Sequence, residues 1–147
     1  MISVAVNDTM FYWVHRFLHC HPVIYKAIHK QHHSYTAPIG ISCEYAHPFE
    51  AAFANFIPAF LGLLLCGSHP VTCFIWVLLR MYETIDAHSG YEFPVTLLNW
   101  IPGINGPARH DYHHSHNKGN YGALTMFWDY VCGTDCWYNN WKQKKEA

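Results

Sequence analysis

The amino-acid sequence predicts an all-α integral membrane protein, in which a transmembrane hairpin carries a cytosolic helical region rich in histidine. Hydrophobic residues make up 51% of the 147-residue chain and charged residues only 13%, compared with roughly 25% in soluble domains. Residues 51–79 contain no lysine, arginine, aspartate or glutamate, and most of the 13 histidines cluster outside this apolar segment. The length of the chain indicates a single domain, residues 1–147.

The segment that precedes the apolar stretch is predicted to be helical. Residues 8–35 are expected to form two helical pieces that are broken at Pro22, because proline cannot donate the backbone hydrogen bond that a helix interior needs. Residues 1–10 lack the basic region that begins a signal peptide.

The apolar stretch itself is predicted to be a helical hairpin. As one helix, residues 51–79 would be about 43 Å long, whereas the hydrocarbon core of a membrane is about 30 Å thick. The turn-forming residues from Gly67 to Pro70 divide the stretch into helices at about 49–66 and 70–87. Pro58 is expected to bend the first helix, which membranes tolerate. The alternative is a buried hairpin in a soluble protein, but so short a chain has little other structure to cover it.

The placement of basic residues predicts the orientation of the hairpin. All nine lysines and arginines lie outside residues 31–79, so the tip of the hairpin carries none. Basic residues favour the cytosolic side of a membrane. Both flanks, and therefore the early and late histidine clusters, are expected to lie on the cytosolic face. After the hairpin, the chain is rich in turns up to Pro107 and is then predicted to be helical.

Three histidine clusters have the spacing of a helix face. Residues at i, i+3 and i+4 share one side of a helix, so the histidines of each cluster are expected to converge on one point. His88 follows the second membrane helix at its cytosolic end. The candidate ligands are His15, His19, His29, His32, His33, His88, His110, His113 and His114.

Nine imidazoles exceed the three or four ligands of a typical zinc site, which favours two metal ions with four or five nitrogens each. The remaining histidines, His21, His47, His69 and His116, are expected to be surface or core residues, although His47 and His116 stay open as further ligands. Three carboxylates near the ligands could accept hydrogen bonds from the imidazoles, although helix capping or surface exposure explains them equally well: Glu83, Asp86 and Asp111.

The chemistry of the clusters favours iron and an oxidation. Imidazole suits zinc, copper, nickel and iron, but the chain lacks the H-E-x-x-H glutamate of zinc hydrolases. An open, histidine-rich binuclear site beside lipid-accessible helices fits the activation of oxygen by iron. No G-x-G-x-x-G motif provides a nicotinamide or flavin domain, so electrons would come from a partner. The net charge of −1 gives no electrostatic reason to expect nucleic acid.

The motifs HRFLH, HKQHH and HDYHH resemble the three histidine boxes of the fatty acid hydroxylase and sterol desaturase superfamily. The segments APIGISCEYAHPFE, ETIDAHSGY and NYGALTMFWDYVCGTD are similar to those of its 4-methylsterol monooxygenase branch. The resemblance covers residues 8–135, with the histidine boxes at 15–33 and 88–114. It implies that the eight box histidines are iron ligands and that His88 matches a further histidine that the family uses.

The resemblance also implies the activity. The chain would be a multi-pass enzyme of the endoplasmic reticulum membrane that oxidises a sterol 4-methyl group with O2 at a di-iron centre. Its electrons would come from cytochrome b5, which NAD(P)H reduces. The C-terminal KKEA is similar to a dilysine retrieval signal, which requires a cytosolic C-terminus, although a solvated basic tail explains it equally well.

Several alternatives remain open at this point. The substrate could be a fatty acid, an alcohol or another position of a sterol. A bis-histidine haem protein would instead place isolated histidines inside apolar helices. Members of the family usually carry further membrane helices before the first box, which begins here at His15. The chain is therefore expected to be truncated at its N-terminus, and a non-catalytic homologue is a further alternative.

Overall fold

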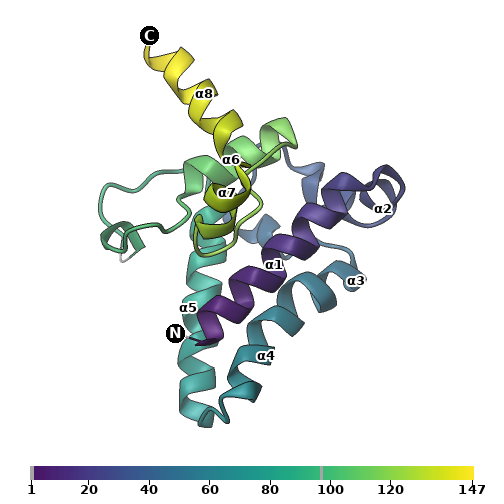
Figure 1. Ribbon diagram of the computed structural model, residues 1–147, viewed down its shortest axis with the longest axis vertical. Helices are drawn as coiled ribbons and strands as arrows, with labels where there is room; N and C mark the ends of the chain where they lie inside the picture. Colours follow the sequence, from purple (N-terminus) through teal and green to yellow (C-terminus); the bar gives the residue numbers. More distant parts are fainter. Residues whose placement is uncertain (1, 97) are drawn as a thin grey trace.

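The computed structural model describes residues 2–96 and 98–147, and these residues are predominantly helical (Figure 1). Within them there is no β-strand, only an isolated antiparallel bridge between Ile104 and Thr125. The all-α prediction is therefore confirmed. The elements are α1 (Ile2–Cys20), α2 (Pro22–Ala27), η1 (His29–Ser34), η2 (Gly40–Glu44), α3 (Pro48–Glu50), η3 (Ala51–Phe56), α4 (Ile57–Leu65), α5 (Pro70–Ala87), η4 (Leu98–Trp100), α6 (Pro107–His116), α7 (Phe127–Cys132) and α8 (Cys136–Glu146).

The first helical region breaks where the sequence predicts. Helix α1 ends at Cys20, and Pro22 occupies the first turn of α2, where its missing N–H is not needed. The second histidine box differs from the expectation, because η1 is a 3₁₀-helix rather than an α-helix. The backbone leaves the α-helical conformation at Ile28, where φ is −121°.

A helical hairpin forms at nearly the predicted boundaries. A continuous helical segment, composed of α3, η3 and α4, runs from Pro48 to Leu65, and α5 runs from Pro70 to Ala87. The two meet at a turn near the bottom of Figure 1, where Gly67 has a positive φ of 56°. The ring of His69 caps α5 by accepting a hydrogen bond from the Val71 N–H at 3.2 Å.

The expected irregularity near Pro58 takes the form of a π-helical turn. Residues Ala51–Phe56 form η3, which leads directly into α4 with Pro58 near its start. Proline lacks the N–H that would bond the carbonyl four residues earlier, and π-helical turns within helices commonly occur at functional sites. Here the turn follows Glu50, a residue that becomes important below.

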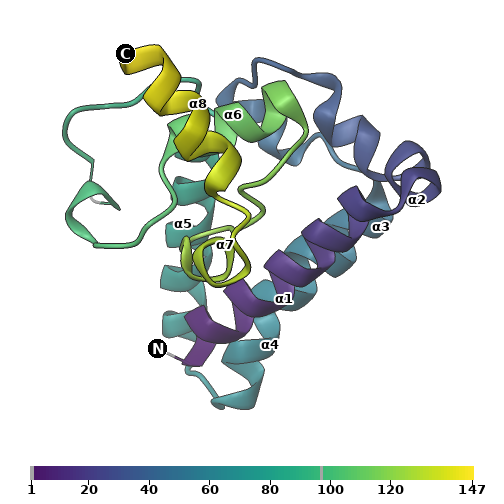
Figure 2. The ribbon, with the colours of Figure 1, turned by 45° about the horizontal axis from the view of Figure 1, so that its top comes forward.

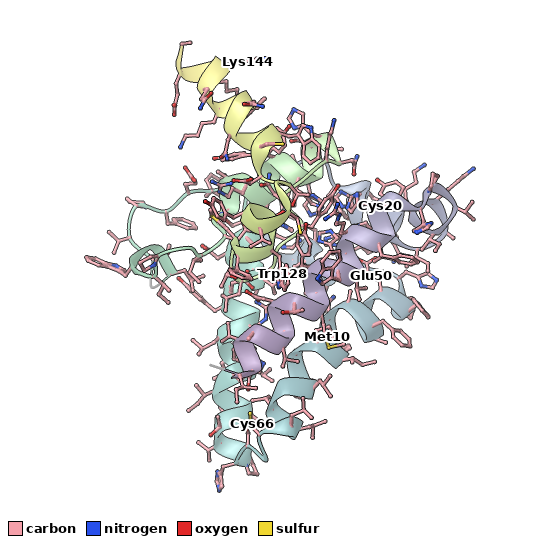
Figure 3. The ribbon with its side chains drawn as sticks, viewed as in Figure 1. Met10, Cys20, Glu50, Cys66, Trp128 and Lys144 are labelled. Atoms are coloured by element: carbon pink, nitrogen blue, oxygen red, sulfur yellow. The ribbon has the colours of Figure 1, made fainter. Side chains whose placement is uncertain are left out.

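The surface of the hairpin is apolar, whereas the interior of the molecule is polar. One helix within the described residues, Pro48–Leu65, is long and apolar enough to cross a membrane. Large apolar side chains such as Phe53, Leu64, Phe74 and Leu78 are exposed on it and on α5. Polar and charged residues outnumber apolar ones among the buried residues that the structure describes. Figure 3 shows many side chains projecting outward along both helices, with Cys66 near the tip.

Helix α1 packs closely against α4, and both views in Figures 1 and 2 show the two side by side. Gly62 makes this approach possible, because a Cβ atom at this position would lie 2.6 Å from the Cα atom of Ser3. Helix α5 is tied to α4 by the Trp76 indole N–H, which donates to the Ala59 carbonyl at 2.9 Å.

Replacing Gly62 with leucine is expected to force α1 and α4 apart. The new side chain would meet backbone rather than a flexible side chain, and overpacking of this kind costs on the order of 2 kcal/mol. The midpoint of thermal unfolding of the detergent-solubilised protein should fall. Gly106→Ala is the matched control, because a Cβ atom there meets nothing within 4 Å. An unchanged midpoint for Gly62→Leu would show that this close approach does not support the fold.

The C-terminal region is fastened to α1 by side-chain hydrogen bonds. The Trp128 indole N–H donates to the Thr9 hydroxyl at 3.0 Å, and the Tyr12 and Thr134 hydroxyls lie 3.0 Å apart. The Asp8 carboxylate accepts a hydrogen bond from the Thr125 N–H at 2.9 Å. These contacts bring the third histidine box, on α6, next to the first box, on α1.

Candidate metal centre

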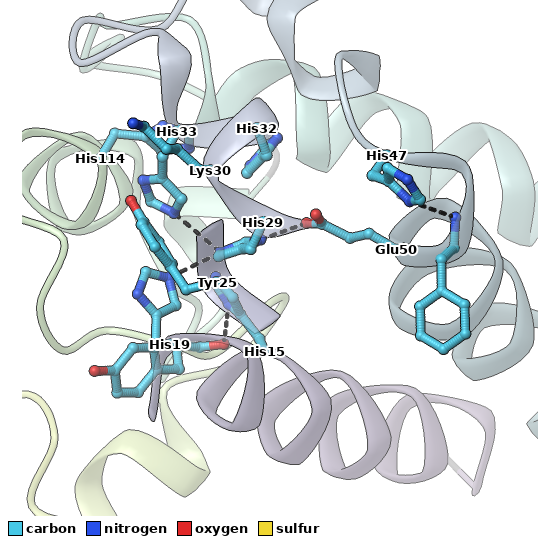
Figure 4. Close-up of polar contacts among 12 residues, drawn as sticks. His15, His19, Tyr25, His29, Lys30, His32, His33, His47, Glu50 and His114 are labelled. Atoms are coloured by element: carbon cyan, nitrogen blue, oxygen red, sulfur yellow. Dashed lines mark hydrogen bonds and ion pairs between the residues drawn. The ribbon is translucent and has the colours of Figure 1, made fainter. Parts of the chain in front are cut away.

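All nine predicted histidines come together in the interior, and they form two groups. Within each group, one potential ligand atom per residue lies within 4.8 Å of every other. The larger group, called here the first group, draws on α1, η1 and α6, and Figure 4 shows part of it. Its members are His15, His19, His29, His33 and His113. The second group consists of His32, His88, His110 and His114.

The expectation that each box converges on a single point is wrong for the second and third boxes. His29 and His33 belong to the first group, whereas His32 belongs to the second. In the third box, His113 joins the first group, and His110 and His114 join the second. Neighbouring side chains on a helix point roughly 100° apart. In both boxes, adjacent histidines belong to different groups, and histidines at i and i+4 belong to the same one.

The imidazoles approach one another through their Nε2 atoms. In the first group, the Nε2 atom of His29 lies 2.8 Å from that of His19 and 3.0 Å from that of His33. The Nε2 atoms of His33 and His113 are 3.1 Å apart. The corresponding distances in the second group are 3.3 Å for His32 and His88, 2.9 Å for His88 and His110, and 3.2 Å for His110 and His114.

Backbone carbonyls fix the orientation of several rings from the opposite side. The Nδ1 atoms of His15 and His113 lie 2.9 and 2.6 Å from the carbonyl oxygens of Tyr121 and Gly119. The Nδ1 atom of His88 lies 2.7 Å from the Thr84 carbonyl oxygen. A carbonyl can only accept, so each of these Nδ1 atoms carries the proton and donates it. The Nε2 atom of the same ring is then left with a free lone pair, as in a metal ligand.

A carboxylate plays the same part for His29. The Nδ1 atom of His29 donates to Oε1 of Glu50 at 2.7 Å (Figure 4). Sequence reasoning proposed Glu83, Asp86 and Asp111 for this role and missed Glu50. Glu83 instead forms an ion pair with Arg80, one turn earlier on α5. The available signal was that Glu50 is an acidic residue directly before a long apolar segment, where a carboxylate needs a partner.

Burial keeps the imidazoles neutral at physiological pH. Desolvation, with a smaller contribution from the positive charge that His88 can carry, lowers the pKa of His15 to about 4. Desolvation also lowers the pKa of His88 to about 4, and that of His114 to about 3. The lower pKa means that the neutral form prevails at pH 7. Neutral imidazole is the form that binds metals.

The donor set fits a metal ion in each group. Two nitrogens that bind one ion at about 2.1 Å and at right angles lie about 3.0 Å apart, close to the observed separations. Without an ion, lone pairs on neighbouring Nε2 atoms would face one another, because the Nδ1 atoms hold the protons of several rings. Both groups could therefore hold a metal ion.

Asp129 organises the loop that supplies two of these carbonyls. Its carboxylate accepts hydrogen bonds from the N–H groups of Tyr121 and Gly122 at 2.9 and 2.7 Å, and from the Thr134 hydroxyl at 2.6 Å. The loop turns at Gly119, which has a positive φ of 70° and leaves no room for a Cβ atom beside the Thr134 carbonyl. The sequence analysis used this region only for its resemblance to the 4-methylsterol monooxygenase branch, so the role of Asp129 was missed.

Asp129→Ala is expected to destabilise the protein and to weaken metal binding. The change leaves the N–H groups of Tyr121 and Gly122 without their acceptor in the interior, which costs roughly 2 kcal/mol or more. The carbonyls of Gly119 and Tyr121 would no longer hold His113 and His15 in place. Thermal unfolding and metal analysis of the purified variant test this expectation. Asp135→Ala is the matched control, since its carboxylate accepts from Asn139 within α8. Equal metal content in both variants would contradict the assigned role.

The four remaining histidines lie outside both groups, as expected. His47 caps α3 by accepting a hydrogen bond from the Phe49 N–H, just as His69 caps α5. His116 is exposed and stacks on Tyr112. His21 is exposed at the break between α1 and α2. In the arrangement that the structure describes, neither His47 nor His116 therefore joins the site.

A cavity of about 180 Å³ opens onto both groups. One side is formed by histidines of the two groups, including His29, His32 and His110. The rest of the lining combines apolar residues, most of them on the hairpin, with polar and charged side chains. Its apolar lining includes Phe56, Ala59, Phe60, Trp76, Val77 and Met81, and its polar lining includes Glu50, Asn55, Arg80 and Glu83. The arrangement can present an apolar molecule to metal ions away from bulk water.

The chain is similar to proteins that act on lipids. Residues 1–134 match the family model described as fatty acid hydroxylase. Methylsterol monooxygenase 1 of Rattus norvegicus is 44% identical over 95% of the chain and 47% of its own length. C-4 methylsterol oxidase erg25 of Schizosaccharomyces pombe is 40% identical over 97% of the chain and 48% of its own length. Very-long-chain aldehyde decarbonylase GL1-11 of Oryza sativa subsp. indica is 42% identical over 97% of the chain and 54% of its own length.

The chain thus spans about half the length of the curated relatives it matches. No solved structure matches the chain significantly.

Proposed function

Because this chain belongs to the fatty acid hydroxylase family, we propose that it is the di-iron region of a membrane monooxygenase that oxidises a sterol 4-methyl group with O2. The observation that carries the proposal is the pair of histidine groups that open onto an apolar cavity between the helices of the hairpin. The names of the rat and fission yeast relatives support a methylsterol as the substrate.

Iron is the metal that suits this activity. Imidazole groups also bind zinc, but zinc undergoes no redox change and cannot serve an oxidation. The first group would hold one iron ion and the second group the other. Bound iron would supply the activation of O2, which side-chain acids and bases cannot provide.

The side chains of this chain hold and shield the centre. Carbonyl groups and Glu50 orient the rings from the Nδ1 side, so the Nε2 atoms point inward together. The apolar residues of the cavity lining would reduce the contact of a bound substrate with water. Each hydroxylation consumes O2 with a pair of electrons and a pair of protons, and it yields an alcohol and water. Further rounds would carry the alcohol through the aldehyde to the acid.

The same proposal places the protein in the membrane of the endoplasmic reticulum. The hairpin, Pro48–Leu65 and α5, would span the bilayer with its exposed apolar side chains against lipid. Both histidine groups and the C-terminus would lie on the cytosolic side, where cytochrome b5 or a similar carrier can deliver electrons derived from NAD(P)H. Arg80 and Glu83 of α5 neutralise one another as an ion pair, which reduces the cost of placing them near the membrane.

Expression in cells that lack their own 4-methylsterol oxidase tests the substrate. The sterol profile should show a fall in 4-methylsterols compared with cells that carry the empty vector. The result that would contradict the proposal is continued accumulation of 4-methylsterols while the protein is present in membranes with its metal bound. Oxidised fatty acids or aldehydes in such cells would point instead to another lipid, a substrate class that the name of the rice relative also suggests.

A further inference from the structure

We propose that the second oxygen of the Glu50 carboxylate binds the hydroxyl group of the substrate and thereby positions the neighbouring methyl group at the metal centre. The inference rests on the proposed function and adds a specificity-determining residue to it. Glu50 thus has two tasks, one toward His29 and one toward the substrate.

The two oxygens of Glu50 have different surroundings. Oε1 accepts a hydrogen bond from Nδ1 of His29 at 2.7 Å. Oε2 is buried and has no hydrogen-bond partner among the described residues. The residue is only 5% exposed and lines the cavity beside the histidines. Figure 4 shows its side chain reaching from the start of the hairpin toward His29.

A buried carboxylate oxygen without a partner is costly, typically by a few kcal/mol. Such a group in a cavity that opens onto a reactive centre indicates that a ligand supplies the missing donor. Of the other charged side chains that line the cavity, Arg80 and Glu83 are paired with one another, and Glu44 is exposed rather than buried. The free acceptor therefore lies at Glu50, next to a proposed metal ligand.

The chemistry of the proposed substrate matches this placement. In a 4-methylsterol, the hydroxyl and the methyl group are attached to neighbouring ring carbons. A hydroxyl that donates to Oε2 would hold the methyl group beside His29 and the rest of the first group. The apolar ring system would then extend along Phe56, Phe60 and Trp76. One hydrogen bond would thus select both the substrate and the carbon that is oxidised.

A comparison of two substrates tests the proposal. In its ionised form the carboxylate only accepts hydrogen bonds, so it favours a 3-hydroxy-4-methylsterol over the 3-keto counterpart. In Glu50→Gln, the amide oxygen can still accept from His29, and the amide NH2 group, a donor, takes the place of Oε2. The ratio of kcat/KM for the hydroxy over the keto sterol should be at least about tenfold in the wild type. In Glu50→Gln, this ratio should be about tenfold lower than in the wild type or should drop below one.

The ratio of the two kcat/KM values is insensitive to a general loss of activity. The preference for one sterol can also be measured by binding, without turnover. If Glu50→Gln oxidises neither sterol, the ratio of the two dissociation constants, measured with labelled sterols on the purified protein, should shift in the same way. Glu92→Gln is the matched control, because Glu92 is exposed and does not line the cavity, and its ratio should stay at the wild-type value.

The outcomes separate this inference from the proposed function. A wild-type protein that oxidises the hydroxy sterol while both ratios are unchanged in Glu50→Gln would overturn the inference alone. A shift in Glu92→Gln without one in Glu50→Gln would do the same. A wild-type protein that oxidises and binds neither sterol would overturn both.

Discussion

Replacing His113 with alanine is expected to abolish the oxidation, with a loss of at least about a hundredfold. His113 is fully buried, and its Nε2 atom lies 3.1 Å from that of His33 in the first group. Its Nδ1 atom donates to the Gly119 carbonyl at 2.6 Å, which fixes the ring. Removing the ring would leave four histidines in the first group with a gap in their arrangement, so this group should bind its ion more weakly and the metal content should fall below about two ions per chain.

His116→Ala provides the matched control. His116 lies on the same helix, only one turn further on, but it is exposed and belongs to neither group. Its replacement should leave both metal content and turnover at the wild-type level. Turnover of the 4-methylsterol by membranes and metal analysis of the purified protein measure the two effects. Retained activity in His113→Ala, with the protein present in membranes, would remove His113 from the site.

Removal of the metal ions is expected to destabilise the whole protein. Nine imidazoles from α1, η1, α6 and the residue that follows α5 meet in the interior, and without ions their Nε2 lone pairs would repel one another. An ion present at about a thousand times its dissociation constant contributes roughly 4 kcal/mol to stability. For a chain of this size, the loss should lower the midpoint of thermal unfolding by roughly 10 °C or more.

The measurement is thermal unfolding of the detergent-solubilised protein before chelation, after chelation and after iron is added back. The midpoint should fall and then recover. His113→Ala, which starts with one group impaired, should show a smaller fall on chelation than the wild type. An equal midpoint in the chelated and untreated wild-type proteins would show that the histidine groups are stable without ions, contrary to the account.

The features that sequence reasoning predicted are those with local signals. The length of the apolar stretch and the turn at Gly67 are enough to place the hairpin within about one residue of its observed boundaries. The nine clustered histidines could be recognised as candidate metal ligands because an ordinary protein core does not contain so many imidazoles at helical spacing. The break before Pro22 follows from the chemistry of proline alone.

The features that sequence reasoning missed depend on contacts between distant segments. The division of the second and third boxes between two groups depends on how η1 and α6 face one another, which helical periodicity does not determine. The role of Asp129 depends on the path of the loop from Gly119 to Gly122. Glu50 meets His29 only because the start of the hairpin returns to η1. The position of a carboxylate along the chain therefore did not predict which carboxylate lies beside the histidines in the structure.

The most direct test of the account is a count of metal ions. The central claim is that two groups of neutral histidines, each gathered around its own point, hold one iron ion apiece. Elemental analysis of the purified, active protein should find about two iron ions per chain. A single zinc ion per chain, with no iron, would contradict the claim.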